Sequence, residues 1–191
     1  MSKILKAYTS LQTADFTKVG TGTVANQCNS LSMVRASNAG AFSCCAMVKA
    51  TPATPFSVIM HFINYGTLAA YQGYGPCWRQ SSDGKISSYI IYTGGGSFNF
   101  LRTAKWTNET TYLGAYGADL LDPLATTQWF KLEDNGTNRI FYMSTDGVSW
   151  VQYHSIGRTD FITANQVGFL IDPYNQACAL VADSFKIEYT G

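Results

Sequence analysis

The stretch Trp129–His154, WFKLEDNGTNRIFYMSTDGVSWVQYH, decides the fold class of this chain. Runs rich in aromatic and β-branched residues flank Asp-Asn-Gly at positions 134–136 and Thr-Asp-Gly at positions 145–147. Asn-Gly and Asp-Gly accept positive φ and favour the primed turns that match the twist of paired strands. The stretch therefore predicts a three-stranded antiparallel meander.

The same pattern of short strands and turns extends outward through the chain. The C-terminal run Ala182–Tyr189 alternates, so that Phe185, Ile187 and Tyr189 should face a core. The other predicted strands are Phe42–Lys49, Phe56–Asn64, Ile86–Thr93, Phe98–Arg102, Gln166–Asp172 and the run that begins at Ala177. A turn is predicted at Gly73–Pro76 and a weak helix at Ala118–Leu124. Many strands with few helix signals predict an all-β sandwich or barrel.

Length and composition narrow the function classes. A chain of 191 residues is the length of one domain, so we expect a single domain over residues 1–191, with residues 1–41 as N-terminal strands or an arm. The chain is 14% aromatic and only 13% charged, with a formal net charge of +1. Such a composition does not suit intrinsic disorder. It also lacks the basic excess of nucleic-acid-binding proteins, so no nucleic-acid partner is expected.

No targeting or membrane segment is expected from the sequence. The start, MSKILK, carries charge but is not followed by the apolar region of a secretory signal. The most apolar stretch, Phe56–Ile63, is far shorter than the ~20 residues of a membrane helix. We therefore predict a soluble protein made in the cytosol, without membrane insertion. Export by a signal peptide would require that a leader has already been removed.

Several segments resemble the concanavalin A-like lectin/glucanase superfamily. They are WFKLEDNG (129–136), IFYMSTDGVSW (140–150), VGF (167–169) and DSFKI (183–187), preceded by GPCWR (75–79) and SDG (82–84). The resemblance covers roughly residues 42–189. It implies an all-β, two-sheet antiparallel jelly-roll sandwich, often with sugar bound on the concave face or at the edge loops. The superfamily includes lectin-like modules, glycoside hydrolases and domains of phage tail and capsid proteins, so it indicates fold more than function.

The carboxylates argue against an enzyme. Glycosidases of this fold need two carboxylates, about 5–5.5 Å apart or about 6.5–9.5 Å apart depending on mechanism. The chain has three glutamates, Glu109, Glu133 and Glu188, and none lies in a Glu-x-Asp-x-x-Glu strand like that of the resembling glucanases. All three are expected to be solvated. No nucleophile elbow or phosphate-binding loop is present either, so we predict a non-enzymatic protein with no catalytic residues.

Cysteine and histidine give no metal signature. An odd number of irregularly spaced cysteines predicts buried free thiols rather than a disulfide framework. These cysteines are Cys28, Cys44, Cys45, Cys77 and Cys178. Neither histidine has a CxxC to join in a zinc site. The sequence leaves open whether the protein has a calcium site, because lectin-like folds often bind calcium and Asp134, Asp172 and Asp183 lie near predicted strand ends. The spacing matches no EF-hand, and we predict neither a metal site nor a cofactor.

An aromatic excess between residues 71 and 117 gives the candidate binding site. Sugars are recognised by aromatic rings that stack on their apolar faces and by polar groups that bind their hydroxyls. The candidate carbohydrate-binding residues are Trp106, Tyr112, Tyr116, Trp78, Tyr92 and Arg102. The alternative is that these rings fill the sandwich or an oligomer contact, since protein interfaces use the same residue types.

These observations favour a phage or viral structural protein. A β-rich composition suited to a particle, without a signal peptide, fits a virion component that leaves the cell by lysis. We predict a capsid decoration, a fibre component or a tail adhesin, with other virion proteins and further copies of itself as partners, for example in a trimer. Host-surface glycan is the further candidate partner. The alternatives are an extracellular, stand-alone lectin-like module or inactive glycoside hydrolase relative, and an active hydrolase or lyase.

Overall fold

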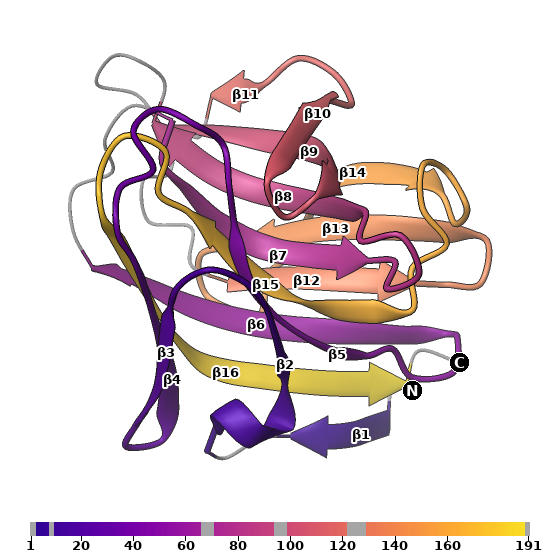
Figure 1. Ribbon diagram of the computed structural model, residues 1–191. Coiled ribbons are helices and arrows are strands. Elements are labelled where there is room, and N and C mark those ends of the chain that lie inside the picture. Colours follow the sequence, from indigo (N-terminus) through magenta and orange to yellow (C-terminus); the bar gives the residue numbers. More distant parts are fainter. Residues whose placement is uncertain (1–2, 8–9, 66–70, 94–98, 122–128, 190–191) are drawn as a thin grey trace.

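Two antiparallel β-sheets face each other across a shared core in the computed structural model (Figure 1). The structure describes residues 3–7, 10–65, 71–93, 99–121 and 129–189. Sheet A has the order β14-β13-β12-β6-β16-β4-β3, with β1 also paired to β16. Sheet B has the order β10-β9-β8-β7-β15-β5-β2, with β11 also paired to β9.

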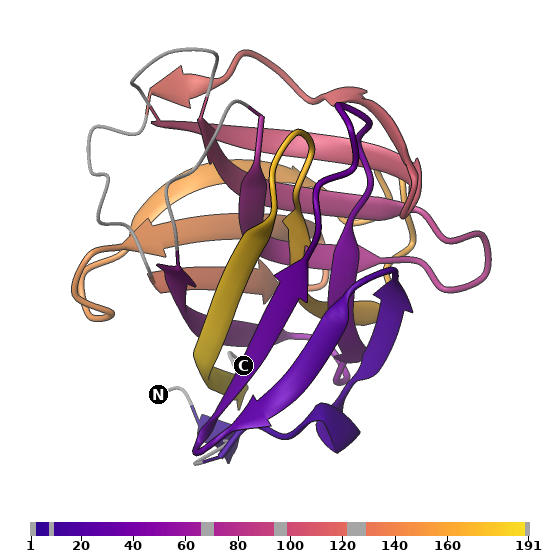
Figure 2. The ribbon, with the colours of Figure 1, turned by 60° about the vertical axis from the view of Figure 1, so that its left-hand side comes forward.

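The strands of sheet A are β1 (Lys3–Ala7), β3 (Thr23–Gln27), β4 (Ser30–Arg35), β6 (Phe56–Tyr65), β12 (Trp129–Asp134), β13 (Asn138–Ser144), β14 (Val151–Gly157) and β16 (Cys178–Tyr189). The strands of sheet B are β2 (Thr17–Gly20), β5 (Cys45–Ala50), β7 (Gly73–Arg79), β8 (Ile86–Thr93), β9 (Asn99–Asn108), β10 (Thr111–Ala115), β11 (Leu120–Leu121) and β15 (Gln166–Asp172). A short 3-10 helix spans Thr13–Asp15. Figure 2 shows the β3–β4 hairpin of sheet A beside the yellow β16. Because β2 belongs to sheet B, the N-terminal part of the chain supplies strands to both sheets.

The predicted meander is confirmed as β12, β13 and β14. Strand β12 pairs with β13 from Trp129↔Ser144 to Asp134↔Arg139, which closes the first turn over the Asn-Gly pair. Gly136 and Gly147 have φ of 92° and 73°, the positive values that these turns require. A Cβ on Gly147 would lie 2.9 Å from the Trp129 ring, so the second turn rests on that indole.

The core between the sheets is built from alternate residues of each strand. Phe141 of β13, Phe169 of β15 and Phe185 of β16 are fully buried there, as the alternation predicts. Each such ring contributes about 1.5–3 kcal/mol by leaving water. At the end of β16, Tyr189 follows Phe185 and Ile187 in the alternation and lies opposite the buried Phe56, but its side chain is 39% exposed.

The predicted turn at Gly73–Pro76 is wrong, because these residues begin β7. Close contact between strands explains the glycines there. A Cβ on Gly75 would lie 2.0 Å from the Tyr89 carbonyl oxygen, and one on Gly168 would lie 1.9 Å from that of Met47. The glycines therefore permit close contact within the sheet and do not mark a turn.

Two further sequence predictions are corrected by the structure. Residues 118–121 form no helix, since Leu120 and Leu121 pair with β9 as β11; the rest of the predicted helix lies outside the described residues. Cys44, Cys45 and Cys77 are buried free thiols as predicted, and Cys178 is half-buried. Cys28 is exposed because it follows β3 in the tight turn to β4.

Candidate functional site

Trp78 cannot be a ligand-stacking residue. Its side chain points from β7 into the space between the sheets, where it is 0% exposed and packs against Phe56 with ring centroids 5.8 Å apart. The prediction of a sugar contact at Trp78 is therefore wrong, because alternation along β7 directs its ring into the core.

Trp106 is buried as well, but on the outer face of sheet B. Its indole is 0% exposed and donates a hydrogen bond from Nε1 to Ser88 Oγ at 3.0 Å. Phe42 and Tyr112 cover it, each in an edge-to-face arrangement, at 6.2 and 5.4 Å. Direct stacking of a ligand on Trp106 is thus ruled out in this conformation. The indole forms the base on which the outer rings lie.

A cluster of aromatic rings lies above Trp106 and is called the sheet-B cluster below. It consists of Phe42, Tyr71, Tyr92, Tyr112 and Tyr174. Phe42 lies 4.7 Å from both Tyr112 and Tyr174, Tyr174 lies 5.2 Å from Tyr71, and Tyr71 stacks on Tyr92 at 6.2 Å. Tyr71 is 39% exposed, Tyr92 is buried, and the other three rings are partly exposed. The cluster therefore presents ring edges and faces at the surface.

An ion pair lies beside these rings. Arg102 donates from Nε and Nη2 to the two carboxylate oxygens of Asp119, at 2.8 and 2.7 Å. The Tyr92 hydroxyl donates to Asp119 at 2.6 Å, and the Arg102 guanidinium lies 4.3 Å from the centre of the Tyr92 ring. Burial alone would raise the pKa of Asp119, but the hydrogen bonds from Arg102 and Tyr92 outweigh it and hold that pKa below its ordinary value. The pair is thus ionised and fixed in position.

The strand pattern explains how these groups meet. On β8 and β9 every second residue points outward, which places Tyr92, Arg102 and Trp106 on one face. The β9–β10 hairpin reaches across the sheet, and the Glu109 carbonyl accepts a hydrogen bond from the Cys44 backbone N–H at 2.7 Å. This contact holds the hairpin beside the loop that carries Phe42.

Tyr116 lies apart from the sheet-B cluster. Its ring is 5.4 Å from that of His154, and its hydroxyl donates to the Asp160 carbonyl at 3.5 Å. It lines a cavity of about 190 Å³ with Tyr153 and His154, and burial lowers the pKa of His154. Of the six predicted residues, the structure gathers Tyr92, Tyr112 and Arg102 in one place and separates Tyr116 from them.

Four members of the site are not among the six predicted residues. Phe42 and Tyr174 lie far from the aromatic-rich segment, Tyr71 lies at its start, and Asp119 lies just after its end. In the sequence, Asp172-Pro173 is a weak signal for a turn at Tyr174. In the structure, Tyr174 follows the end of β15 and has a φ of 44°. Tyr71, at φ 64°, shares that unusual backbone.

The outer face of sheet A carries a second set of aromatic side chains. Lys131 Nζ lies 3.9 Å from the centre of the Tyr142 ring and 5.3 Å from that of Trp150. The Trp129 and His61 rings lie 4.4 Å apart in a tilted arrangement. The Trp129, Tyr142 and Trp150 side chains are partly exposed.

Two glutamates share that face of sheet A. Glu133 and Glu188 both pair with Ser57, from the two strands that flank β6. Strands two apart put their Cα atoms roughly 10 Å from each other. Both side chains are partly exposed. Glu188 is ion-paired with Lys186 at 2.6 Å.

The three aspartates considered for calcium lie with other partners. Asp134 binds Arg158 at 2.8 Å, His61 Nδ1 lies 2.6 Å from an Asp183 oxygen, and Asp172 accepts from the Ser43 backbone N–H. Within the described ranges, no three His, Cys, Asp or Glu side chains are placed to hold one metal ion. Those ranges also contain no helix long and apolar enough to cross a membrane.

Solved structures share this architecture at low sequence identity. The CBM2 module of the evolved Dit of Lactobacillus casei BL23 phage J-1 superposes with a TM-score of 0.64 at 10% identity, over 98% of this chain and 96% of that one. The exoplasmic/lumenal domain of VIP36, bound to Ca²⁺ and Man3GlcNAc, gives 0.58 at 12% identity over 98% and 89%. A xylan β-1,4-xylosidase from Bacillus halodurans C-125 gives 0.61 at 12% identity, but this chain covers only 33% of it.

The chain thus has the concanavalin A-like jelly-roll fold, as the sequence predicts. No known protein-family model and no curated protein sequence matches it. At these identities the neighbours establish the fold alone.

Proposed function

We propose that this protein is a non-catalytic glycan-binding component of a phage or viral particle. The observation that carries the proposal is the sheet-B cluster, in which partly exposed rings surround the fixed Arg102–Asp119 pair. Aromatic faces stack on the apolar faces of sugars, while a carboxylate and a guanidinium bind hydroxyl groups. The cluster therefore offers both kinds of contact that a neutral sugar needs.

A glycan array tests the site directly. The wild type should bind a defined set of glycans, and Tyr71→Ala should lose the signal while the fold stays intact, because Tyr71 is among the more exposed rings. Tyr142→Ala is the matched control, since that ring lies on sheet A beneath Lys131. An equal signal from the wild type and Tyr71→Ala would remove Tyr71 from the site.

The virion part of the proposal has separate support. The CBM2 module of the phage J-1 evolved Dit shares this fold over nearly the same length, which supports a place on a phage particle. The low charge of the chain suits burial of its faces against other copies or other virion proteins, for example in a trimer. Light scattering should give a multiple of 20.9 kDa, and portal, capsid or tail genes should lie beside its gene. A monomer among sugar-metabolism genes would favour the extracellular stand-alone module.

A hydrolase is the second candidate, and it rests on Glu133 and Glu188 on either side of Ser57. Two carboxylates on one sheet face match the general plan of glycosidases. The Lys186–Glu188 ion pair gives Glu188 a structural role, which is why we favour the non-catalytic function. Release of reducing sugar from polysaccharides, abolished in Glu133→Gln and Glu188→Gln, would establish the enzyme instead.

A further inference from the structure

An arginine occupies a core position at one end of the sandwich. Along β4, Leu31, Met33 and Arg35 alternate inward, and Arg35 is only 7% exposed. Its Nη2 donates to the Ser43 hydroxyl, whereas Nη1 is buried without a hydrogen-bond partner among the described residues. A buried guanidinium with unpaired N–H groups destabilises the fold unless another group compensates its charge.

Charge compensation of Arg35 by carboxylates is incomplete among the residues that the structure describes, although the charged form of Asp172 attracts the guanidinium. The ion pairs of the described chain leave Arg35 out. Asp172 is the acidic group nearby, and its Oδ1 accepts from the backbone N–H groups of Ser43 and Tyr174 at 3.3 and 3.2 Å. Burial raises the pKa of Asp172 to about 7, so this carboxyl is partly protonated at neutral pH.

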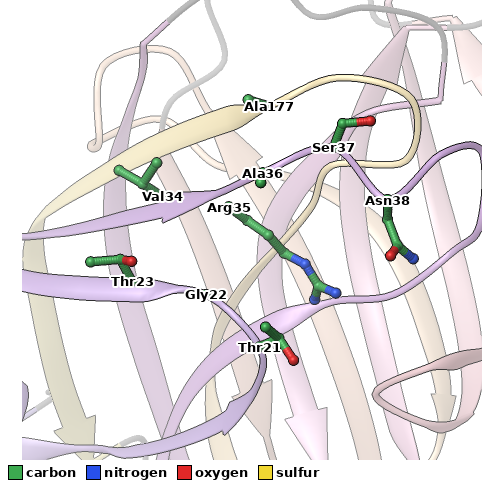
Figure 3. Close-up of a pocket in the computed structure, with 9 residues that line it drawn as sticks. All are labelled: Thr21, Gly22, Thr23, Val34, Arg35, Ala36, Ser37, Asn38 and Ala177. Carbon is green, nitrogen blue, oxygen red and sulfur yellow. The ribbon is translucent and has the colours of Figure 1, made fainter.

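Arg35 lines a surface cavity of about 570 Å³, a size typical of small-ligand sites. The cavity lies between the β2–β3 turn and the end of β4, and Figure 3 shows the Arg35 side chain extending among the lining residues, with its guanidinium between Thr21 and Asn38 in this view. Thr21, Thr23 and Ser37 add hydroxyl groups to the lining. The lining residues include one charged side chain, the cationic Arg35, and none belongs to the sheet-B cluster.

We infer that this cavity binds an oxyanion group, carboxylate or phosphate, carried on a sugar-sized polar ligand. Arg35 supplies the charge and the free Nη1–H donor, since planar guanidinium groups suit oxyanions. The threonine and serine hydroxyls contact the polar body of the ligand. The site is a second one, and it would stand even if the sheet-B cluster bound nothing.

Titration calorimetry at constant ionic strength tests the site with four probes: D-galacturonate, D-galactose 6-phosphate, D-galactose and inorganic phosphate. At least one charged sugar should bind tenfold or more tightly than galactose and more tightly than free phosphate. Arg35→Met should reduce that affinity at least tenfold, and an apolar residue of similar volume is tolerated at a buried charged position. Arg139→Met is the matched control, because Arg139 is a fully buried arginine that does not line this cavity.

A second variant tests the cavity without replacing Arg35, so that loss of binding does not depend on removing a buried residue. Ala177→Trp fills the cavity from its exposed rim, keeps Arg35 and should also abolish binding. Equal binding of galactose and galacturonate, binding of free phosphate as tight as that of the sugar phosphate, or full affinity in both Arg35→Met and Ala177→Trp would each overturn the inference.

Discussion

Replacing Asp172 with asparagine should change how the stability of the protein depends on pH. The Asp172 side chain is fully buried, its Oδ2 has no hydrogen-bond partner in the described part of the chain, and burial raises its pKa to about 7. The folded protein therefore keeps this proton to higher pH than the unfolded chain, whose carboxyl has the ordinary pKa of about 3.8. The wild type loses stability through this group as the pH rises from about 4 to about 7.

The size of the effect follows from the two pKa values. A pKa of about 7 against 3.8 corresponds to at most about 4 kcal/mol. The free energy of unfolding of Asp172→Asn, relative to wild type, should thus rise by up to about 4 kcal/mol between pH 4 and pH 8. Any change in packing caused by the amide is independent of pH and leaves this difference intact.

Urea denaturation at a series of pH values measures the effect, provided that the free energy of unfolding depends on urea concentration with the same slope in both proteins. Asp119→Asn is the control with the opposite sign. Hydrogen bonds hold the pKa of Asp119 below its ordinary value, so its charged form stabilises the fold above pH 4. The free energy of unfolding of Asp119→Asn should therefore fall relative to wild type as the pH rises above that value. If the difference in free energy of unfolding between Asp172→Asn and wild type were constant from pH 4 to pH 8, the buried, protonated Asp172 carboxyl would be refuted.

Two substitutions and one thiol-labelling experiment test the packing. Trp78→Ala should lower the free energy of unfolding by about 3–5 kcal/mol, because the ring is fully buried; a loss below about 1 kcal/mol in urea denaturation would contradict its core position. Gly168→Ala should prevent folding as judged by circular dichroism, since its Cβ would lie 1.9 Å from a backbone oxygen, whereas Gly117→Ala, with open space around it, should fold normally. In a thiol-reagent assay Cys28 should react at once and Cys77 only after unfolding, because burial raises the pKa of Cys77 to about 12; rapid reaction of Cys77 in the native protein would be inconsistent with that burial.

The closing half of the fold was predictable because its signals are local. Asn-Gly and Asp-Gly turns join adjacent strands, so pairing of β12, β13 and β14 follows from neighbouring residues alone. Strand β7 was not predictable in this way. Its Gly75 is required by the carbonyl of Tyr89 on β8, a contact that no local pattern reveals, and glycine beside proline otherwise signals a turn.

The candidate site was predictable only in part. The aromatic excess pointed to Tyr92, Tyr112 and Arg102, which do meet. Phe42 and Tyr174 join them through sheet pairing between segments far apart in the sequence. Burial of Trp78 and Trp106 is the alternative that the sequence left open, because the residues next to each tryptophan do not reveal which face of its strand is covered.

The dissociation constant of the best array glycan, measured for wild type and Tyr112→Ala, tests the central claim most directly. Tyr112 lies within the sheet-B cluster, 5.8 Å from the Arg102 guanidinium to its ring centre. Loss of one stacking ring should weaken binding at least tenfold, equivalent to about 1.4 kcal/mol, while Tyr142→Ala on the opposite sheet should bind as the wild type does. Equal affinity of Tyr112→Ala and wild type, or the absence of any bound glycan, would contradict glycan binding by the sheet-B cluster.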